Sequence, residues 1–255
     1  MQGAIVTGGA SGLGRAIAIA LAREGYKVVI ADVCEEPREG GPSTHEHIRS
    51  LGGEAEFVAT DVTDEAQVIQ VVEFAVQRFG PLSVMCNNAG ISGLFEPVVD
   101  TNVDDFDRIV RVNVRGVFLG CKHAARQMIA QESGGVIVNT ASCFGIVGFP
   151  TMAPYCATKG AVIQLTRSLA LEVAPYQIRV NALCPGTLDT EMDREQREDL
   201  VAGDDLGRRT PLSTPTGSFF GSPENQADAV AFLVSDAAQW MTGQCLVMDG
   251  GWTAI

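Results

Sequence analysis

The sequence predicts an α/β protein: a doubly wound parallel sheet in a single domain, residues 1–255, with helices on both faces. Short, continuous apolar runs, typical of strands buried on both faces, alternate along the chain with segments whose apolar residues recur at helical spacing. No shift in composition marks a second domain, and no internal repeat is present. Because helical crossovers between parallel strands are right-handed, this alternation gives a doubly wound sheet.

The elements are expected in a regular order. The first strand, residues 3–9, ends in glycines, and the helix that follows, 14–25, has Gly25 as its stop signal. The other expected strands are 27–33, 54–62, 82–90, 135–142, 178–186 and 243–251, and the other helices are about 64–79, 103–131, 153–173 and 223–235.

Two segments interrupt this alternation. Residues 34–45 are polar and rich in Gly and Pro, and they are interpreted as a loop. Residues 187–222 are long, polar and broken by Gly and Pro. A loop of that length in a compact domain is usually functional, so we expect 187–222 to act as a substrate lid.

The composition suits a globular protein, since 46% of the 255 residues are hydrophobic. The formal net charge of -13 argues against nucleic acid and membrane surfaces as partners, because clustered Lys and Arg bind phosphates. No signal peptide is visible, and no apolar run approaches the roughly 20 residues of a membrane span. The seven cysteines lack a C-x-x-C pair, so we expect reduced thiols in a cytoplasmic protein.

A glycine-rich turn lies between the first strand and the first helix. TGGASGLG places Gly8, Gly12 and Gly14 where a backbone can approach a pyrophosphate at a helix N-terminus. Tight turns also use glycine for steric reasons alone. Asp32, at the end of the second strand, favours the functional interpretation, because a carboxylate there binds a ribose diol. The pattern predicts a Rossmann-like dinucleotide site.

Asp32 also predicts which dinucleotide binds. A 2′-phosphate would face this carboxylate, whereas proteins that bind NADP usually offer Arg or Lys. Ala10, Ser11 and Val33 surround the turn, and the nearest expected cation, Arg15, lies inside the helix. We therefore expect NAD as the cofactor.

Tyr155 and Lys159 lie four residues apart in an expected helix and so share one face of it. Pro154 is tolerated there because it falls in the first turn. One positive charge at roughly 4 Å and an effective dielectric near 20 is worth about 4 kcal/mol, which could lower a phenol pKa by up to about three units. The phenol then becomes a competent base near neutral pH. A chance Tyr and Lys on one face is the alternative, and the glycine turn argues against it.

A set of motifs occurs in one order along the chain: TGGASGLG, Asp61-Val62, NNAG at 87–90, Asn113, Ser142, Tyr155 with Lys159, and PGTLDT at 185–190. In order and spacing, the set resembles the short-chain dehydrogenase/reductase family from residue 3 to about 251. The resemblance implies that Tyr155 is the general acid/base and that Lys159 lowers its pKa and holds the nicotinamide ribose. It also implies that Ser142 donates to the substrate oxygen and that Asn113 joins a water-mediated proton relay.

The resemblance further implies a set of cofactor contacts, among them the adenine at Asp61 and Val62 and the nicotinamide at the PGTLDT loop. No metal is expected, since Tyr and Ser replace a Lewis acid. A homotetramer is implied, assembled through the helices that carry Asn113 and Tyr155. The full set of expected cofactor-binding residues is Gly8, Ser11, Gly12, Leu13, Gly14, Asp32, Asp61, Val62, Asn88, Tyr155, Lys159, Leu188 and Thr190.

The substrate pocket is expected at loops after the strands, in 92–95, 143–149, 151–152 and 188–192. No Lys or Arg occurs between Arg126 and Lys159, so an anionic group near the reacting carbon would lack a partner. We expect an uncharged, mostly apolar secondary alcohol or its ketone. Arg208 and Arg209 would bind an anion if they folded over it, but a solvated surface pair is the simpler interpretation.

Other polar groups receive structural interpretations. HEH at 45–47 offers two metal ligands but is interpreted as a polar loop, and Cys143 has no His near it in sequence. Phe219 and Phe220 either close the lid or dock it to the core.

The leading hypothesis is an NAD-dependent secondary alcohol dehydrogenase. A ketone or 3-oxoacyl reductase working in the reductive direction is the first alternative, because the same site serves both directions. A non-catalytic NAD-binding redox sensor is the second, and an intact Tyr155, Lys159 and Ser142 argue against it.

Overall fold

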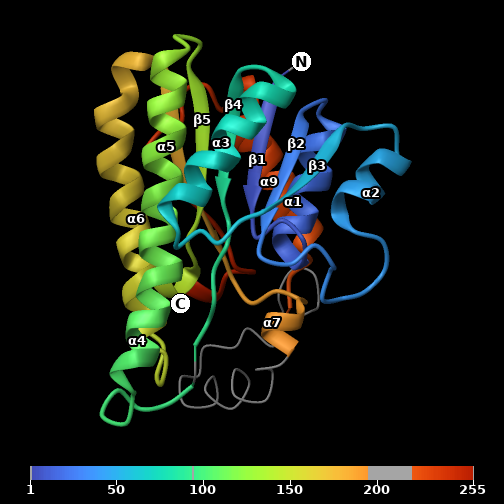
Figure 1. Ribbon diagram of the computed structural model, residues 1–255. Helices are drawn as coiled ribbons and strands as arrows, with labels where there is room; N and C mark the ends of the chain where they lie inside the picture. The colour runs from blue at the N-terminus through green and yellow to red at the C-terminus, as the bar shows by residue number, and fades with distance from the viewer. Residues whose placement is uncertain (1, 94, 195–219, 255) are drawn as a thin grey trace.

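The computed structural model describes residues 2–93, 95–194 and 220–254, and the seven expected strands form one parallel sheet (Figure 1). The strands lie in the order β3-β2-β1-β4-β5-β6-β7. Because the order reverses between β1 and β4, the sheet is doubly wound, as the sequence predicts. The strands are β1 (Gly3–Thr7), β2 (Lys27–Asp32), β3 (Ala55–Ala59), β4 (Leu82–Asn87), β5 (Gly135–Thr140), β6 (Ile178–Pro185) and β7 (Cys245–Met248).

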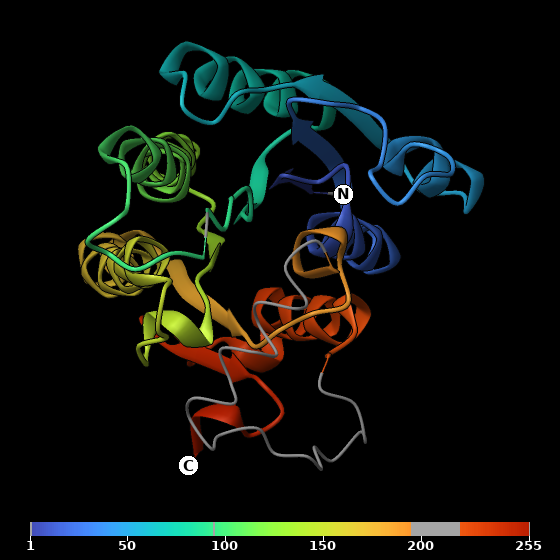
Figure 2. The same ribbon diagram turned by 90° about the horizontal axis from the view of Figure 1, so that it is seen from below.

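Helices cover both faces of the sheet (Figure 2). One apolar core lies between the sheet and α3 (Glu65–Phe79), α5 (Val117–Ala130) and α6 (Ala153–Val173). The other lies between the sheet and α1 (Gly12–Arg23), α2 (Thr44–Ser50) and α9 (Pro223–Val234). The central strands contribute side chains to both cores, which explains why they are continuously apolar in sequence.

The helix α2 begins at Thr44 and therefore corrects the interpretation of HEH and of residues 44–45 as a loop, whereas residues 34–43 have no regular secondary structure, as predicted. Ser43 and Glu46 form a capping box at its start, and Ile48 is buried in the core below it. His45 is also buried, with its ring 3.2 Å from Ser43 Oγ and 3.4 Å from Glu35 Oε1. A helix of seven residues with Ile48 as its single apolar side chain gives too weak a hydrophobic periodicity to be recognised in the sequence.

The expected helix 103–131 is divided into three parts. α4 (Val103–Val110) and α5 are joined by a π-helical turn, Arg111–Gly116, which contains Asn113. Such π turns are frequent at functional sites because they change where side chains point. Within 187–222, a short helix, α7 (Glu191–Arg194), is also present.

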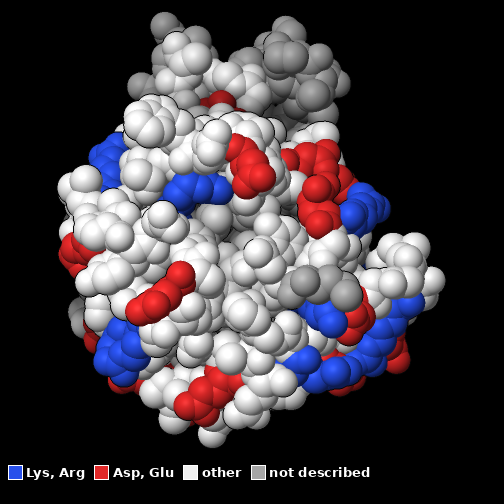
Figure 3. Space-filling model, turned by 90° about the horizontal axis from the view of Figure 1, so that it is seen from above, with Lys and Arg blue, Asp and Glu red and all other residues white. Residues whose placement is uncertain are grey.

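The surface carries both signs of charge. On the face shown in Figure 3, Lys and Arg side chains lie among Asp and Glu. No helix in the described part of the chain is long and apolar enough to cross a membrane. Among the described residues, no group of three or more His, Cys, Asp or Glu could hold a metal ion.

Candidate active site

One cavity of about 460 Å³ lies at the carboxyl ends of the strands, where the strand order reverses. Its volume is in the range of small-molecule and cofactor sites. Every expected cofactor residue lines it, from Gly8 in the first turn to Thr190 after β6. Ser142 lines it too, whereas Asn113 lies buried behind it. The fold therefore brings the predicted residues together from segments far apart in sequence.

The glycine turn is shaped by close backbone contacts. Gly8 and Gly12 have φ of 64° and 53°, values that favour glycine. A side chain on Gly14 would place its Cβ 1.9 Å from the carbonyl oxygen of Gly8. The Asn88 amide donates to the carbonyls of Thr7 and Gly8 and therefore fixes this turn from β4. Asn88 thus has a bracing role besides its place in the cavity wall.

Gly14→Ala is expected to destabilise the protein by about 2 to 3 kcal/mol, because the added methyl must displace backbone. Gly160→Ala is the matched control, since its Cβ would meet only the Gly145 carbonyl oxygen at 3.7 Å. That control should be neutral or slightly stabilising in its helix. Urea unfolding followed by circular dichroism measures both changes. Equal stabilities for the two variants would contradict the steric argument.

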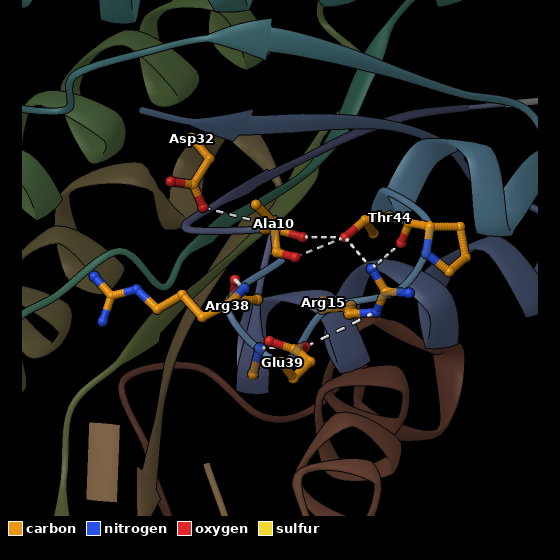
Figure 4. Close-up of polar contacts among 10 residues, drawn as sticks. Ala10, Arg15, Asp32, Arg38, Glu39 and Thr44 are labelled. Atoms are coloured by element: carbon orange, nitrogen blue, oxygen red, sulfur yellow. Dashed lines mark hydrogen bonds and ion pairs between the residues drawn. The ribbon is translucent and has the colours of Figure 1, made fainter. Parts of the chain in front are cut away.

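Several acids line the end of the cavity beside β2. The Asp32 carboxylate accepts a hydrogen bond from the N–H of Ala10 at 3.0 Å (Figure 4) and another from the N–H of Val33 at 2.8 Å. Sequence reasoning missed four wall residues from the following segment: Cys34, Glu36, Arg38 and Glu39. Their position directly after an acid at the carboxyl edge of the sheet was the available signal.

Lys159 is buried at the other end of the cavity, on the first turns of α6. Only 4% of it is exposed, its Nζ donates to the carbonyl of Thr140 at 3.0 Å, and Nζ lies 5.4 Å from the centroid of the Tyr155 ring. Burial lowers the pKa of Lys159 to about 8. The helical spacing of Tyr155 and Lys159 therefore places a buried ammonium beside the phenol ring.

Asn113 holds the chain that follows β4. Its Oδ1 accepts from the N–H of Ile91 and its Nδ2 donates to the carbonyl of Ile91, both at 2.8 Å. Nδ2 also lies 3.2 Å from Thr158 Oγ1, next to Lys159. A Cβ on Gly90 would lie 3.2 Å from Asn113 Oδ1 and 3.5 Å from Lys159 Nζ, so these two groups flank one narrow space. Asn113 thus positions Ile91 in this structure, and its part in a proton relay stays a prediction.

Ser142 follows β5 and lies at the start of a short 3-10 turn. Its Oγ accepts from the N–H of Phe144 at 3.2 Å, and the residue is 7% exposed. Cys143 is also buried, and burial raises the pKa of its thiol to about 12. The thiol is therefore protonated at neutral pH, in keeping with its interpretation as a structural residue.

An aromatic cluster lies behind Ser142 and Tyr155. The Phe144 ring packs 4.9 Å from Phe149 and 5.2 Å from Trp252, measured between centroids. Trp252 is set by a turn in which Asp249 accepts from Gly251 and Thr253. Through Trp252, the C-terminal segment of this chain packs against its own site.

The segment after β6 closes another wall of the cavity. Leu188 and Gly221 form an isolated bridge, so both ends of 187–222 lie side by side. Thr190 lies over the glycine turn, 3.4 Å from where a Cβ on Gly12 would be. Arg208, Arg209 and Phe219, for which roles were considered, lie outside the described residues. Ser92, Phe144 and Met152, which were predicted to form the substrate pocket, line the cavity.

These residues fit a nicotinamide dinucleotide. Within the described chain, the N–H groups of Leu13 and Gly14 at the start of α1 donate to no protein acceptor. They suit a pyrophosphate, Asp32 suits a ribose diol, and Lys159 supplies a buried cation at the far end. The cavity joins all three.

Comparison with known proteins agrees with this geometry. Residues 8–253 match the family model described as enoyl-(acyl carrier protein) reductase. A 2-(S)-hydroxypropyl-CoM dehydrogenase of Xanthobacter autotrophicus is 40% identical over 98% of this chain and 96% of its own length. The cis-4-hydroxycyclohexanecarboxylate dehydrogenase of Sinomonas cyclohexanicum is 41% identical over 99% of this chain and 96% of its own.

Solved structures show the same fold. A short-chain type dehydrogenase/reductase from Mycobacterium marinum superposes with a TM-score of 0.88 at 34% identity, over 100% of this chain and 96% of that one. Sequence and structure thus match over nearly the whole length. The chain belongs to the short-chain dehydrogenase/reductase family of oxidoreductases.

Proposed function

We propose that this protein is an NAD-dependent oxidoreductase that transfers a hydride between an uncharged, mostly apolar secondary alcohol or ketone and the nicotinamide. The observation that carries the proposal is one continuous cavity with Asp32 and the glycine turn at one end and Tyr155 beside buried Lys159 at the other. That arrangement supports both a dinucleotide and a proton-transfer group.

The roles of the chain's own residues follow from their positions. In the oxidative direction Tyr155 accepts the proton of the substrate hydroxyl as its carbonyl forms, and Ser142 donates a hydrogen bond to that oxygen. Lys159 favours the ionised phenol because its positive charge lies close by. Asn113 fixes Ile91 and Thr158 around the lysine. The bound nicotinamide supplies the hydride acceptor.

NAD is proposed over NADP because Asp32 lies where the adenosine ribose is expected to bind. Glu36 and Glu39 line the same end and add negative charge. Arg38 also lines it, and among the described lining residues at this end it is the basic side chain that would favour a phosphate. The acids outnumber it, which supports NAD.

The substrate is proposed to be uncharged because the wall near Ser142 and Tyr155 is apolar. Phe144, Met152, Leu188 and Met192 contribute to it, and Glu191 is an acid. Among the described lining residues, the only basic side chains are Lys159 and Arg38. The named substrate of the Sinomonas relative is a ring alcohol that carries a carboxylate. A ring alcohol without the carboxylate fits this wall better.

A matched substrate pair tests the proposal. The purified protein is assayed by NADH absorbance with cis-4-methylcyclohexanol and with cis-4-hydroxycyclohexanecarboxylate, each with NAD and NADP. We expect kcat/KM at least about tenfold higher for the neutral alcohol and for NAD, because an unpaired carboxylate in an apolar wall is costly. Preference for the acid would refute the neutral substrate, and preference for NADP would refute NAD.

The reductive direction remains open as the first alternative, since microscopic reversibility gives both directions one site. The family resemblance also leads us to propose a homotetramer through the helices near Asn113 and Tyr155. Phe106, Phe118 and Leu171 support this, because they are large apolar residues exposed on α4, α5 and α6.

A further inference from the structure

The segment between β2 and α2, residues 33–43, folds back over the glycine turn (Figure 4). Arg15 of α1 anchors its far end, with Nη1 2.8 Å from the carbonyl oxygen of Pro42 and 3.3 Å from Thr44 Oγ1. The buried Thr44 hydroxyl lies 2.9 Å from the carbonyl oxygen of Gly9. The segment is therefore fixed to the turn that it covers.

Two polar contacts join the middle of this segment to the turn itself. The N–H of Arg38 donates to Ser11 Oγ at 2.8 Å, and Glu39 Oε1 accepts from the N–H of Gly12 at 3.0 Å. On the other side of Ser11, the N–H of Ala10 donates to Asp32. The chain's own carboxylates thus occupy the backbone donors on both sides of Ser11.

The charges around Ser11 are unbalanced. The ion-pair partner of Glu39 is Arg15, whose Nε lies 3.9 Å from Glu39 Oε1. The same guanidinium also donates hydrogen bonds to Pro42 and Thr44. Figure 4 shows the Arg38 side chain pointing away from Glu39. The Glu39 side chain is 33% exposed, so its field is partly screened but reaches the cavity that it lines.

Because of these contacts, only some of the N–H groups at the start of α1 are available to a ligand. Glu39 takes the N–H of Gly12, while the N–H groups of Leu13 and Gly14 have no acceptor within the described residues. A pyrophosphate can use those two donors without displacing Glu39. A further phosphate near Ser11 would instead meet two carboxylates, Asp32 and Glu39, and no free backbone donor at Ala10 or Gly12.

We propose that Glu39 is a second selectivity residue, which acts with Asp32 to exclude dinucleotides that carry a 2′-phosphate. This inference rests on the proposed function, because it requires that a nicotinamide dinucleotide binds in the cavity. Glu39 sits in a segment that has no regular structure and follows no sequence motif, so only its contact with Gly12 reveals the role.

Direct binding tests the role of Glu39. Dissociation constants of NADPH and NADH are measured by nicotinamide fluorescence for the parent protein, Glu39→Gln and Glu35→Gln. Gln keeps an acceptor for the N–H of Gly12 but removes the charge. Glu35 lies in the same segment and pairs with His45 instead of lining the cavity, so it controls for net charge.

In Glu39→Gln we expect NADPH to bind about tenfold more tightly and NADH to change less than about threefold, because only NADPH brings a phosphate toward Ser11. The gain should shrink in about 0.5 M salt, which screens an exposed charge. Glu35→Gln should leave the NADPH-to-NADH ratio within about twofold of the parent ratio.

Three results would overturn the proposal. Equal tightening of both dinucleotides would mean that Glu39 competes with the pyrophosphate, and no change in either would mean that it is structural. An equal change of the NADPH-to-NADH ratio in Glu35→Gln would mean that the effect of Glu39 comes only from the net charge of the protein. A parent that prefers NADPH would instead refute the proposed NAD dependence, while the ratio between variant and parent still reports on Glu39.

Discussion

Replacing Tyr155 with phenylalanine is expected to lower kcat by about 10² to 10⁴, while NADH binds with nearly unchanged affinity. The substitution removes only the hydroxyl, and the ring keeps its edge contact with Phe144, at 6.4 Å between centroids. The loss is the usual contribution of one general acid/base. Steady-state rates on the matched substrate pair and fluorescence titration with NADH measure the two quantities separately.

Two outcomes of this experiment would change the interpretation. A Tyr155→Phe rate within about tenfold of the parent rate would show that another group transfers the proton. A parent protein that binds NADH but turns over no alcohol or ketone would favour the redox-sensor alternative, particularly if the variant bound NADH equally well. Circular dichroism of the variant confirms that the fold is intact.

Lys159→Met is expected to lose most activity and yet to raise the free energy of unfolding at pH 7 by about 1 to 2 kcal/mol. A buried ammonium whose pKa falls from 10.5 to about 8 carries an unfavourable burial term of about 3 kcal/mol. Loss of its hydrogen bond to the carbonyl of Thr140 cancels about 1 kcal/mol or more of that gain. Methionine has a similar length and keeps the packing. Urea unfolding and assays of the same samples measure both effects.

The stability advantage of Lys159→Met should decrease as pH rises from 8 to about 10. The folded parent releases the lysine proton near pH 8, whereas the unfolded chain holds it to about pH 10.5. Between these values the unfolded state binds more protons, so parent stability rises with pH. Other groups cancel in the comparison. A constant difference across pH 7 to 10 would show that Lys159 is not destabilised by burial.

The fold and the membership of the cavity were largely predictable from the sequence. The strands are continuously apolar because both faces are covered, and this pattern is local in the chain. Gly14 and Asp32 sit at fixed offsets from β1 and β2, so their convergence follows once the strands are known to be parallel. Helix α2 and the π turn at Asn113 were missed, because a short capped helix and a single inserted turn leave almost no periodic signal.

The sequence by itself determined the doubly wound sheet, the glycine turn with Asp32, and the spacing of Tyr155 and Lys159. Only the tertiary structure decided the burial of Lys159, the hydrogen bonding of Asn113 to Ile91, and the hydrogen bond of Glu39 with the N–H of Gly12. The physical reason is the distance along the sequence over which each kind of interaction acts. Periodicity and turn chemistry act over a few residues, whereas burial and hydrogen bonding across 22 or 27 positions depend on how separate elements pack.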